Sequence, residues 1–247
     1  PRFGSCCLQG KVRLPHPLSP PPLLHRLLTV HSHSPHESDA FKIKAREFCK
    51  HIRRYNAALA FVSCGIRAQD GFVNHMNQPV PGAGPYTFRV HGQFYHRIGS
   101  LLPQQGQQPK YAQLYIYDPH DDAARCQMNQ FRIDRNADQD PQLMLDLHDM
   151  MVEHNPWVQV YRNGHERMQH TPPDQHDLPL RIHIDIQQDQ WCYNAPVVDE
   201  IAAIIPGDGT DVDNTRDIIL HRVIPLLQRI SEIHPAYTPL HYVLLFP

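Results

Sequence analysis

Apolar residues recur at helical spacing between Ser38 and Gly65. Alternating steps of four and three residues place one set of side chains on a single helix face: Phe41, Ala45, Phe48, Ile52, Tyr55, Leu59 and Val62. Ser38 is a favourable N-cap residue, Asp39 follows in the first turn, and Gly65 is a helix terminator. The pattern therefore predicts a helix that begins at Ser38 and ends at Gly65.

Two segments of strand character, 86–100 and 111–118, occur within residues 81–118, and a turn-rich LLPQQGQQP separates them. Along the first segment, Tyr86, Phe88, Val90 and Phe94 keep to alternate positions. Alternation of this kind is typical of strands with one buried face. We expect two strands joined by a loop, in which four aromatic residues serve as core or strand-face residues rather than as base-stacking platforms: Tyr86, Phe88, Tyr115 and Tyr117.

Two further helices are predicted in the second half of the chain. Asp140 with Pro141 opens the first, which ends before Asn155-Pro156. The next covers 157–168 and points three residues inward: Trp157, Val160 and Tyr161. The preceding segment, 118–140, is polar and carries no predicted helix.

The remaining segments are predicted as strands or as irregular chain. Residues 15–37 are dense in Pro, Ser and His and are expected to form a disordered tether with at most one short apolar turn. Strands are predicted at 180–186, 200–206 and 216–222, with the last two paired as a hairpin. Residues 226–233 fit either a strand or a helix. The mixed order favours an α+β class, with antiparallel strand pairs, about three packed helices and a disordered N-terminal segment.

Charge is uneven along the chain. The net charge is −2, yet residues 1–60 hold 10 Lys and Arg against 3 Asp and Glu. A basic arm on an acidic body fits contact with DNA phosphates, and it equally fits a solubilising imbalance. The cations expected to make the contact, if one is made, are Lys11, Arg13, Lys42, Lys44, Arg46, Lys50, Arg53 and Arg54.

No stretch of the sequence approaches the ~18 uninterrupted apolar residues of a membrane helix, and the first residues lack the apolar core of a signal peptide. We therefore expect a soluble, intracellular protein. The six cysteines form no CxxC pair, which favours free thiols.

Residues 82–103 read GAGPYTFRVHGQFYHRIGSLLP and residues 109–118 read PKYAQLYIYD. Further short motifs follow the same order along the chain: Cys6-Cys7, Gly10-Lys11-Val12, Leu14-Pro15, Ile52-Arg53, Tyr55-Asn56, Ala60-Phe61, Tyr193-Asn194, 200–205, Gly207-Asp208, 216–219, His234-Pro235 and 244–247. Together these motifs resemble the N-terminal region of Helitron transposases, the helicase-like proteins of rolling-circle transposons.

The resemblance implies a piece truncated at both ends. In the family, Cys6 and Cys7 would close a zinc-finger-like motif whose first cysteines lie upstream, so zinc is expected only in a full-length parent and no cofactor in this piece. The rolling-circle nuclease and the helicase would follow the residue equivalent to Pro247 and would be partners of this region, in the nucleus. The expected organisation is a tether at 1–37 and a single α+β module at 38–247.

Two functions remain open. The first is a non-catalytic fragment of a Helitron-like transposase, structural or weakly DNA-binding, without enzymatic activity. The second is a small metal-dependent phosphodiesterase in which His183 and Asp185 hold a metal and Tyr193 attacks the phosphodiester. No phosphate loop of the form GxxxxGK[ST] occurs, so no helicase motor is expected.

Overall fold

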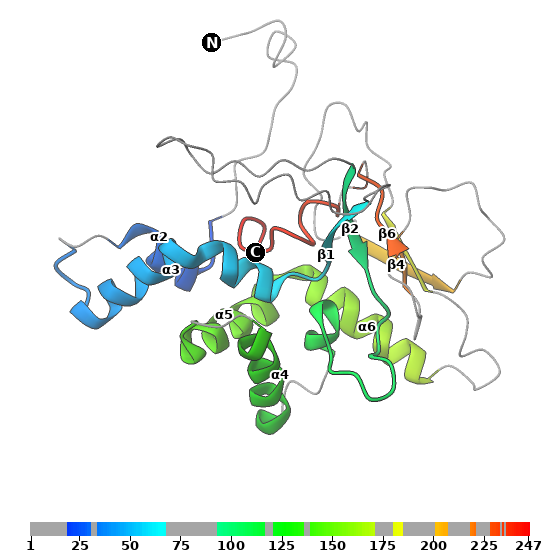
Figure 1. Cartoon of the computed structure of the whole chain (residues 1–247), viewed down its shortest axis with the longest axis horizontal. Helices are drawn as coiled ribbons and strands as arrows, with labels where there is room; N and C mark the ends of the chain where they lie inside the picture. Colours follow the sequence, from blue (N-terminus) through cyan, green and yellow to red (C-terminus); the bar gives the residue numbers. More distant parts are fainter. Residues whose placement is uncertain are drawn as a thin grey trace, which may run out of the picture.

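The structure, a computed structural model, describes much of the chain: residues 19–30, 34–67, 93–116, 121–135, 139–170, 180–184, 201–206, 218–220, 228–232, 234 and 236–247. This part is mostly helical, with antiparallel strands in two small sheets (Figure 1). Five α-helices occur within it, where the sequence predicted about three. None of the described helices combines the length and the apolar character needed to cross a bilayer.

The first predicted helix is confirmed, except at its end. Helix α3 (Asp39–Leu59) begins where the Ser38 side chain accepts a hydrogen bond from the Phe41 N–H at 3.2 Å. It stops at Leu59 rather than at Gly65, because the next residues turn to extended geometry and enter the core. The Phe61 N–H donates to the Leu240 carbonyl at 3.0 Å, and the Phe61 carbonyl accepts from the Ala112 N–H at 3.2 Å.

Helix α2 (Pro22–Thr29) corrects the prediction of a tether in this part of 1–37. Leu24 and Leu27 are buried, and the helix packs against α3 and α5. The Pro-rich composition argued against regular structure here. One pair of leucines three residues apart is nevertheless enough to hold a short helix when neighbouring helices cover the pair. Pro22 itself stands at the first helical position, where its missing N–H costs nothing.

Helices α5 (Pro141–His154) and α6 (Pro156–His170) are confirmed. Asp140 caps α5 by accepting hydrogen bonds from the Gln142 and Leu143 N–H groups, at 2.9 and 3.2 Å. The Asn155 side chain accepts from the Trp157 N–H at 3.0 Å and so starts α6. The three residues predicted to point inward from α6 are all buried: Trp157, Val160 and Tyr161.

Helix α4 (Asp122–Arg135) was not predicted, because its buried side includes polar residues. Asn129 and Arg132 are both buried; Asn129 donates to the Pro141 carbonyl at 3.1 Å and Arg132 to the Leu114 carbonyl at 3.4 Å. Hydrophobic periodicity cannot detect a face of this composition.

The predicted pair of strands at 86–100 and 111–118 is wrong in its pairing. Strand β2 (Gln93–Ile98) lies within the first segment, but its antiparallel neighbours are β1 (Ser63–Arg67) and β6 (Gln228–Arg229). The segment Tyr111–Tyr115 forms a 3₁₀ turn, η2, instead of a strand. The turn crosses the end of α3, where the Tyr115 hydroxyl donates to the Leu59 carbonyl at 2.7 Å.

Tyr115 is fully buried, which confirms its prediction as a core residue. The other three aromatic residues of that prediction lie outside the described residues: Tyr86, Phe88 and Tyr117.

The second sheet has the order β4-β3-β5. Strand β3 (Leu180–Ile184) is central, and both β4 (Ile201–Pro206) and β5 (Ile218–Leu220) pair with it in antiparallel register. The predicted hairpin between the last two strands is therefore wrong. The closeness of β4 and β5 in the sequence favoured pairing between them. In the structure each pairs with a different edge of β3.

The C-terminal segment, residues 236–247, returns to the middle of the molecule beside the end of α3 (Figure 1). Asn56 fixes it there with both halves of its side-chain amide: Nδ2 donates to the His241 carbonyl at 2.8 Å and Oδ1 accepts from the Leu244 N–H at 3.1 Å. Leu240, Val243 and Leu244 are buried as a result.

Replacing Asn56 with Ala removes both hydrogen bonds and leaves two backbone groups of the C-terminal segment without them. We expect Asn56→Ala to lower the free energy of unfolding by about 1–3 kcal/mol, measured by urea denaturation. Asn163→Ala is the matched control, because Asn163 is exposed on α6, and it should change stability by less than about 0.5 kcal/mol. Equal stabilities of the two variants would contradict the clamping role of Asn56.

His148 makes stability depend on pH. Burial, followed by the positive charges of Arg132, Arg162 and Arg125, holds its pKa well below the ordinary value of 6.5. Between that lowered pKa and about pH 6.5, the unfolded chain binds a proton at this position and the folded chain does not. The contribution of His148 to the free energy of unfolding is therefore fully present above about pH 6.5. It is lost as the pH falls below that value, by up to about 1.4 kcal/mol per pH unit.

The variant His148→Phe keeps a ring beside Tyr115, whose centroid lies 5.3 Å from that of His148, and removes the titration. We expect it to lose less stability than the wild type between about pH 7 and about pH 5.5, measured by urea unfolding. The control His154→Phe changes an exposed histidine of the same helix. The idea fails if His148→Phe and wild type show the same slope of stability against pH.

Candidate functional site

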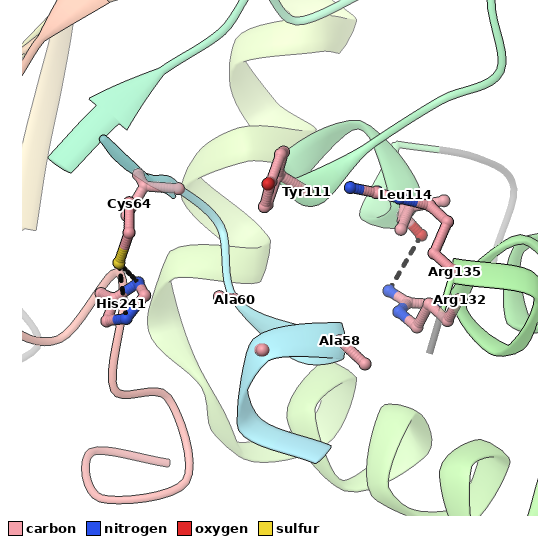
Figure 2. Close-up of a pocket in the computed structure, with 10 residues that line it drawn as sticks. Ala58, Ala60, Cys64, Tyr111, Leu114, Arg132, Arg135 and His241 are labelled. Atoms are coloured by element: carbon pink, nitrogen blue, oxygen red, sulfur yellow. Dashed lines mark hydrogen bonds between the residues drawn. The ribbon is translucent and has the colours of Figure 1, made fainter. Parts of the chain in front are cut away.

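A cavity of about 380 Å³ lies beside the end of α3. Its walls come from α3, β1, η2, α4 and the C-terminal segment: Ala57, Ala58, Ala60, Val62, Cys64, Tyr111, Leu114, Arg132, Arg135 and His241. Figure 2 shows Cys64 and His241 at one end and the two arginines at the other, with small alanine side chains between them. The space exists because Ala58 and Ala60 are too small to fill it.

The arginine end of the cavity is cationic. The Arg132 guanidinium is buried and lies 4.6 Å from the centroid of the Tyr115 ring, and that of the exposed Arg135 lies 4.9 Å from the Tyr111 ring. Tyr111 has a φ of 55°, which is uncommon for a residue other than glycine and stores strain at the cavity wall.

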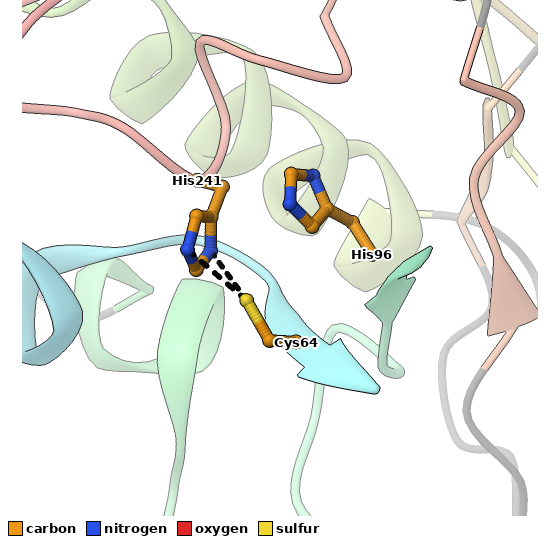
Figure 3. Close-up of side chains that lie close together, drawn as sticks. All are labelled: Cys64, His96 and His241. Carbon is orange, nitrogen blue, oxygen red and sulfur yellow. Dashed lines mark hydrogen bonds between the residues drawn. The ribbon is translucent and has the colours of Figure 1, made fainter. Parts of the chain in front are cut away.

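At the other end, three metal-ligating side chains meet: Cys64 from β1, His96 from β2 and His241 from the C-terminal segment (Figure 3). Their ligand atoms all lie within 4.8 Å of one another. Cys64 Sγ is 3.1 Å from His241 Nε2 and 3.5 Å from Nδ1. Because both ring nitrogens are nearly equidistant from it, the sulfur lies over the face of the imidazole.

The surroundings of the two histidines of this cluster favour the neutral form. Burial lowers the pKa of His96, and burial together with His96 lowers the pKa of His241. The protein around the exposed Cys64 raises the pKa of its thiol. Neutral imidazoles are the form that binds metal, and a thiol gives up its proton to a metal that coordinates it.

Helix α3 carries six of the cations predicted to touch DNA. Three of them form ion pairs: Lys42 with Asp39 at 3.1 Å, Lys50 with Glu47 at 3.4 Å and Lys44 with Asp140 at 3.2 Å. The other three are exposed: Arg46, Arg53 and Arg54. Within the described part of the chain, Arg46 and Arg53 make no ion pair, so their charges are the ones open to an external anion.

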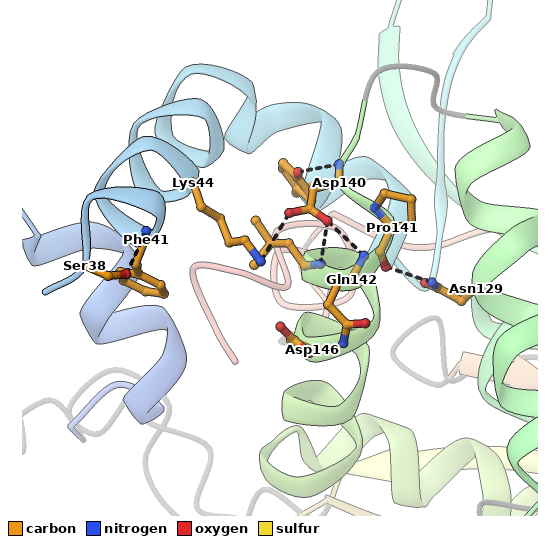
Figure 4. A network of polar contacts seen from close by, with 10 residues as sticks. Ser38, Phe41, Lys44, Asn129, Asp140, Pro141, Gln142 and Asp146 are labelled. Atoms are coloured by element: carbon orange, nitrogen blue, oxygen red, sulfur yellow. Dashed lines mark hydrogen bonds and ion pairs between the residues drawn. The ribbon is translucent and has the colours of Figure 1, made fainter.

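Lys44 differs from its neighbours because its partner organises the fold. Asp140 caps α5, and its N–H donates to the Tyr55 hydroxyl at 3.1 Å (Figure 4). Lys44 therefore ties α3 to the start of α5, which is a structural task. Sequence spacing alone placed Lys44 with the other cations and gave no sign of Asp140.

Several predicted site residues cannot be placed. Cys6, Cys7, Lys11 and Arg13 lie outside the described residues. The same holds for Asp185 and Tyr193 of the predicted phosphodiesterase site, and His183 is described only as a backbone position in β3.

The cluster of Cys64, His96 and His241 was not predicted from the sequence. Its members are separated by 32 and 145 residues, so no ligand spacing such as CxxC marks them.

Comparisons of this chain with protein-family models, with curated proteins and with solved structures find no match.

Proposed function

We propose that the chain is the N-terminal α+β module of a Helitron-like transposase, without catalytic activity of its own, which braces the neighbouring parts of such a protein and binds DNA weakly. The observation that carries the DNA-binding part is the exposed arginine face of α3. The bracing part is supported by the hydrogen bonds that residues of the Helitron-like motifs make between distant segments.

Residues of the motifs that resemble the Helitron N-terminal region make hydrogen bonds across the chain, with one another and with other segments. Asn56 holds the segment that ends in 244–247, and Phe61 bonds to Leu240 and Ala112. Gln113 Nε2 donates to the Ser100 carbonyl at 2.9 Å, and Asn155 Nδ2 donates to the Phe246 carbonyl at 3.1 Å. These contacts support a role in holding a framework together.

The arginine face suits a phosphate backbone. Arg46 and Lys50 lie one turn apart on α3, and Arg53 and Arg54 follow beyond a kink at His51, where φ is −113° and ψ is 16°. Cations presented in a row along a helix contact phosphates and read no bases. Glu47 lies among them and pairs with Lys50, which reduces the attraction.

The four cations of the α3 face set the salt dependence that this face contributes. One phosphate contact from each gives a slope of log K against log salt near −2.8 for single strands and near −3.6 for duplex DNA, at about −0.7 and −0.9 per contact. We expect weak binding of unrelated sequences with a contribution from α3 no steeper than this, measured by fluorescence anisotropy at two salt concentrations. The double variant Arg46→Glu, Arg53→Glu should bind more weakly and with a shallower slope.

Two controls isolate the face itself. Arg46→Lys with Arg53→Lys keeps the charges and should keep the slope. Lys110→Glu with Arg229→Glu makes the same change in net charge at exposed positions away from α3 and should leave most of the binding intact.

If the glutamate double variant binds as tightly as wild type with the same slope, α3 is only a solvated face and the module is purely structural. Nicking of single-stranded DNA that requires Mn²⁺ and is lost in His183→Ala would instead support a phosphodiesterase.

A further inference from the structure

We propose that Cys64, His96 and His241 form a Zn²⁺ site that fastens the C-terminal segment to the β1–β2 sheet. This inference does not rest on the proposed function, because it follows from three side chains and their surroundings. Thiolate and imidazole are the ligands that zinc prefers in proteins.

The distances are compatible with one ion. In a tetrahedral zinc site, bonds of about 2.3 Å to sulfur and about 2.05 Å to nitrogen separate the two ligand atoms by about 3.6 Å. The contacts of Cys64 Sγ with the two His241 nitrogens are 3.1 and 3.5 Å, and all ligand atoms lie within 4.8 Å. The ligand atoms are therefore close enough to share one ion once the His241 ring is reoriented.

His96 is already oriented as a ligand. Its Nδ1 lies 2.8 Å from the Tyr237 carbonyl, so Nδ1 carries the proton and Nε2 carries the lone pair. A second hydrogen bond of this kind fixes the tautomer and the ring plane of most metal-bound histidines. The Tyr237 ring stacks on that of His96 with centroids 4.0 Å apart and holds the ring from one side.

His241 must rotate to bind, because its ring now presents a face to the sulfur. The ring lies 4.4 Å from that of His96 and 4.7 Å, edge-on, from the exposed Tyr242. Rotation about the Cβ–Cγ bond aims one nitrogen at the shared point. Cys64 is exposed, which gives the ion a path into the site.

The site would link distant parts of the chain. Cys64 and His241 are 177 residues apart, and a zinc ion bound to both prevents the C-terminal segment from leaving the sheet. Three protein ligands leave the fourth position to a water molecule. An ion that binds the folded chain and not the unfolded chain raises its unfolding temperature.

The first experiment uses the wild-type chain and its own cysteines as controls. Alkylation by iodoacetamide is followed by mass spectrometry at Cys64, Cys49 and Cys126, all of them exposed, with and without Zn²⁺. We expect Zn²⁺ to slow alkylation of Cys64 at least about tenfold and to leave Cys126 unchanged. Equal rates at Cys64 in the two conditions would overturn the proposal, and this test requires no variant to fold.

The second experiment replaces zinc with Co²⁺, whose visible spectrum reports thiolate ligation. We expect one thiolate-ligated Co²⁺ per chain in wild type and in Cys126→Ser, and loss of the thiolate band in Cys64→Ser. His241→Ala should weaken Co²⁺ binding by at least about tenfold. A thiolate band that persists in Cys64→Ser would place the metal at other cysteines and contradict the proposed site.

Discussion

Phe61 connects the end of α3 to the C-terminal segment, to η2 and to α6. Its N–H bonds to the C-terminal segment and its carbonyl to η2, while its ring contacts those of Tyr115 and Tyr161, with centroids 4.8 and 5.3 Å away. Helix α3 has to end before Phe61, because in a continued helix the Phe61 N–H and carbonyl would be hydrogen-bonded within the helix. One residue therefore sets where the longest described helix stops and which three segments meet at its end.

The helices with strong local signals could be predicted from the sequence. Ser38 and Asp140 are side-chain caps, and each begins a helix where its type and position indicated. What could not be predicted depends on partners far away in the chain. Leu24 and Leu27 are buried only because α3 and α5 cover them, and Tyr111–Tyr115 turns because Leu59 and Phe61 offer hydrogen-bonding groups there.

The candidate sites show the same division. The cations of α3 could be read from their spacing, but the pairing of Lys44 with Asp140 joins residues 96 positions apart and separates a bracing lysine from the exposed arginines. Cys64, His96 and His241 meet because β1 pairs with β2 and the C-terminal segment returns to them. The proposed bracing function and the proposed zinc site are consistent with one task, which is to hold a fixed shape.

The most direct test of this account is native-state hydrogen exchange at the amides that join the segments at Phe61. If the motif residues form one cooperative framework, the amides of Phe61, Ala112 and Leu244 open only by global unfolding, with the same free energy as core amides of α5 such as Leu147. If the Phe61 and Leu244 amides instead exchange orders of magnitude faster than those of α5, the C-terminal segment detaches independently and the bracing role is wrong.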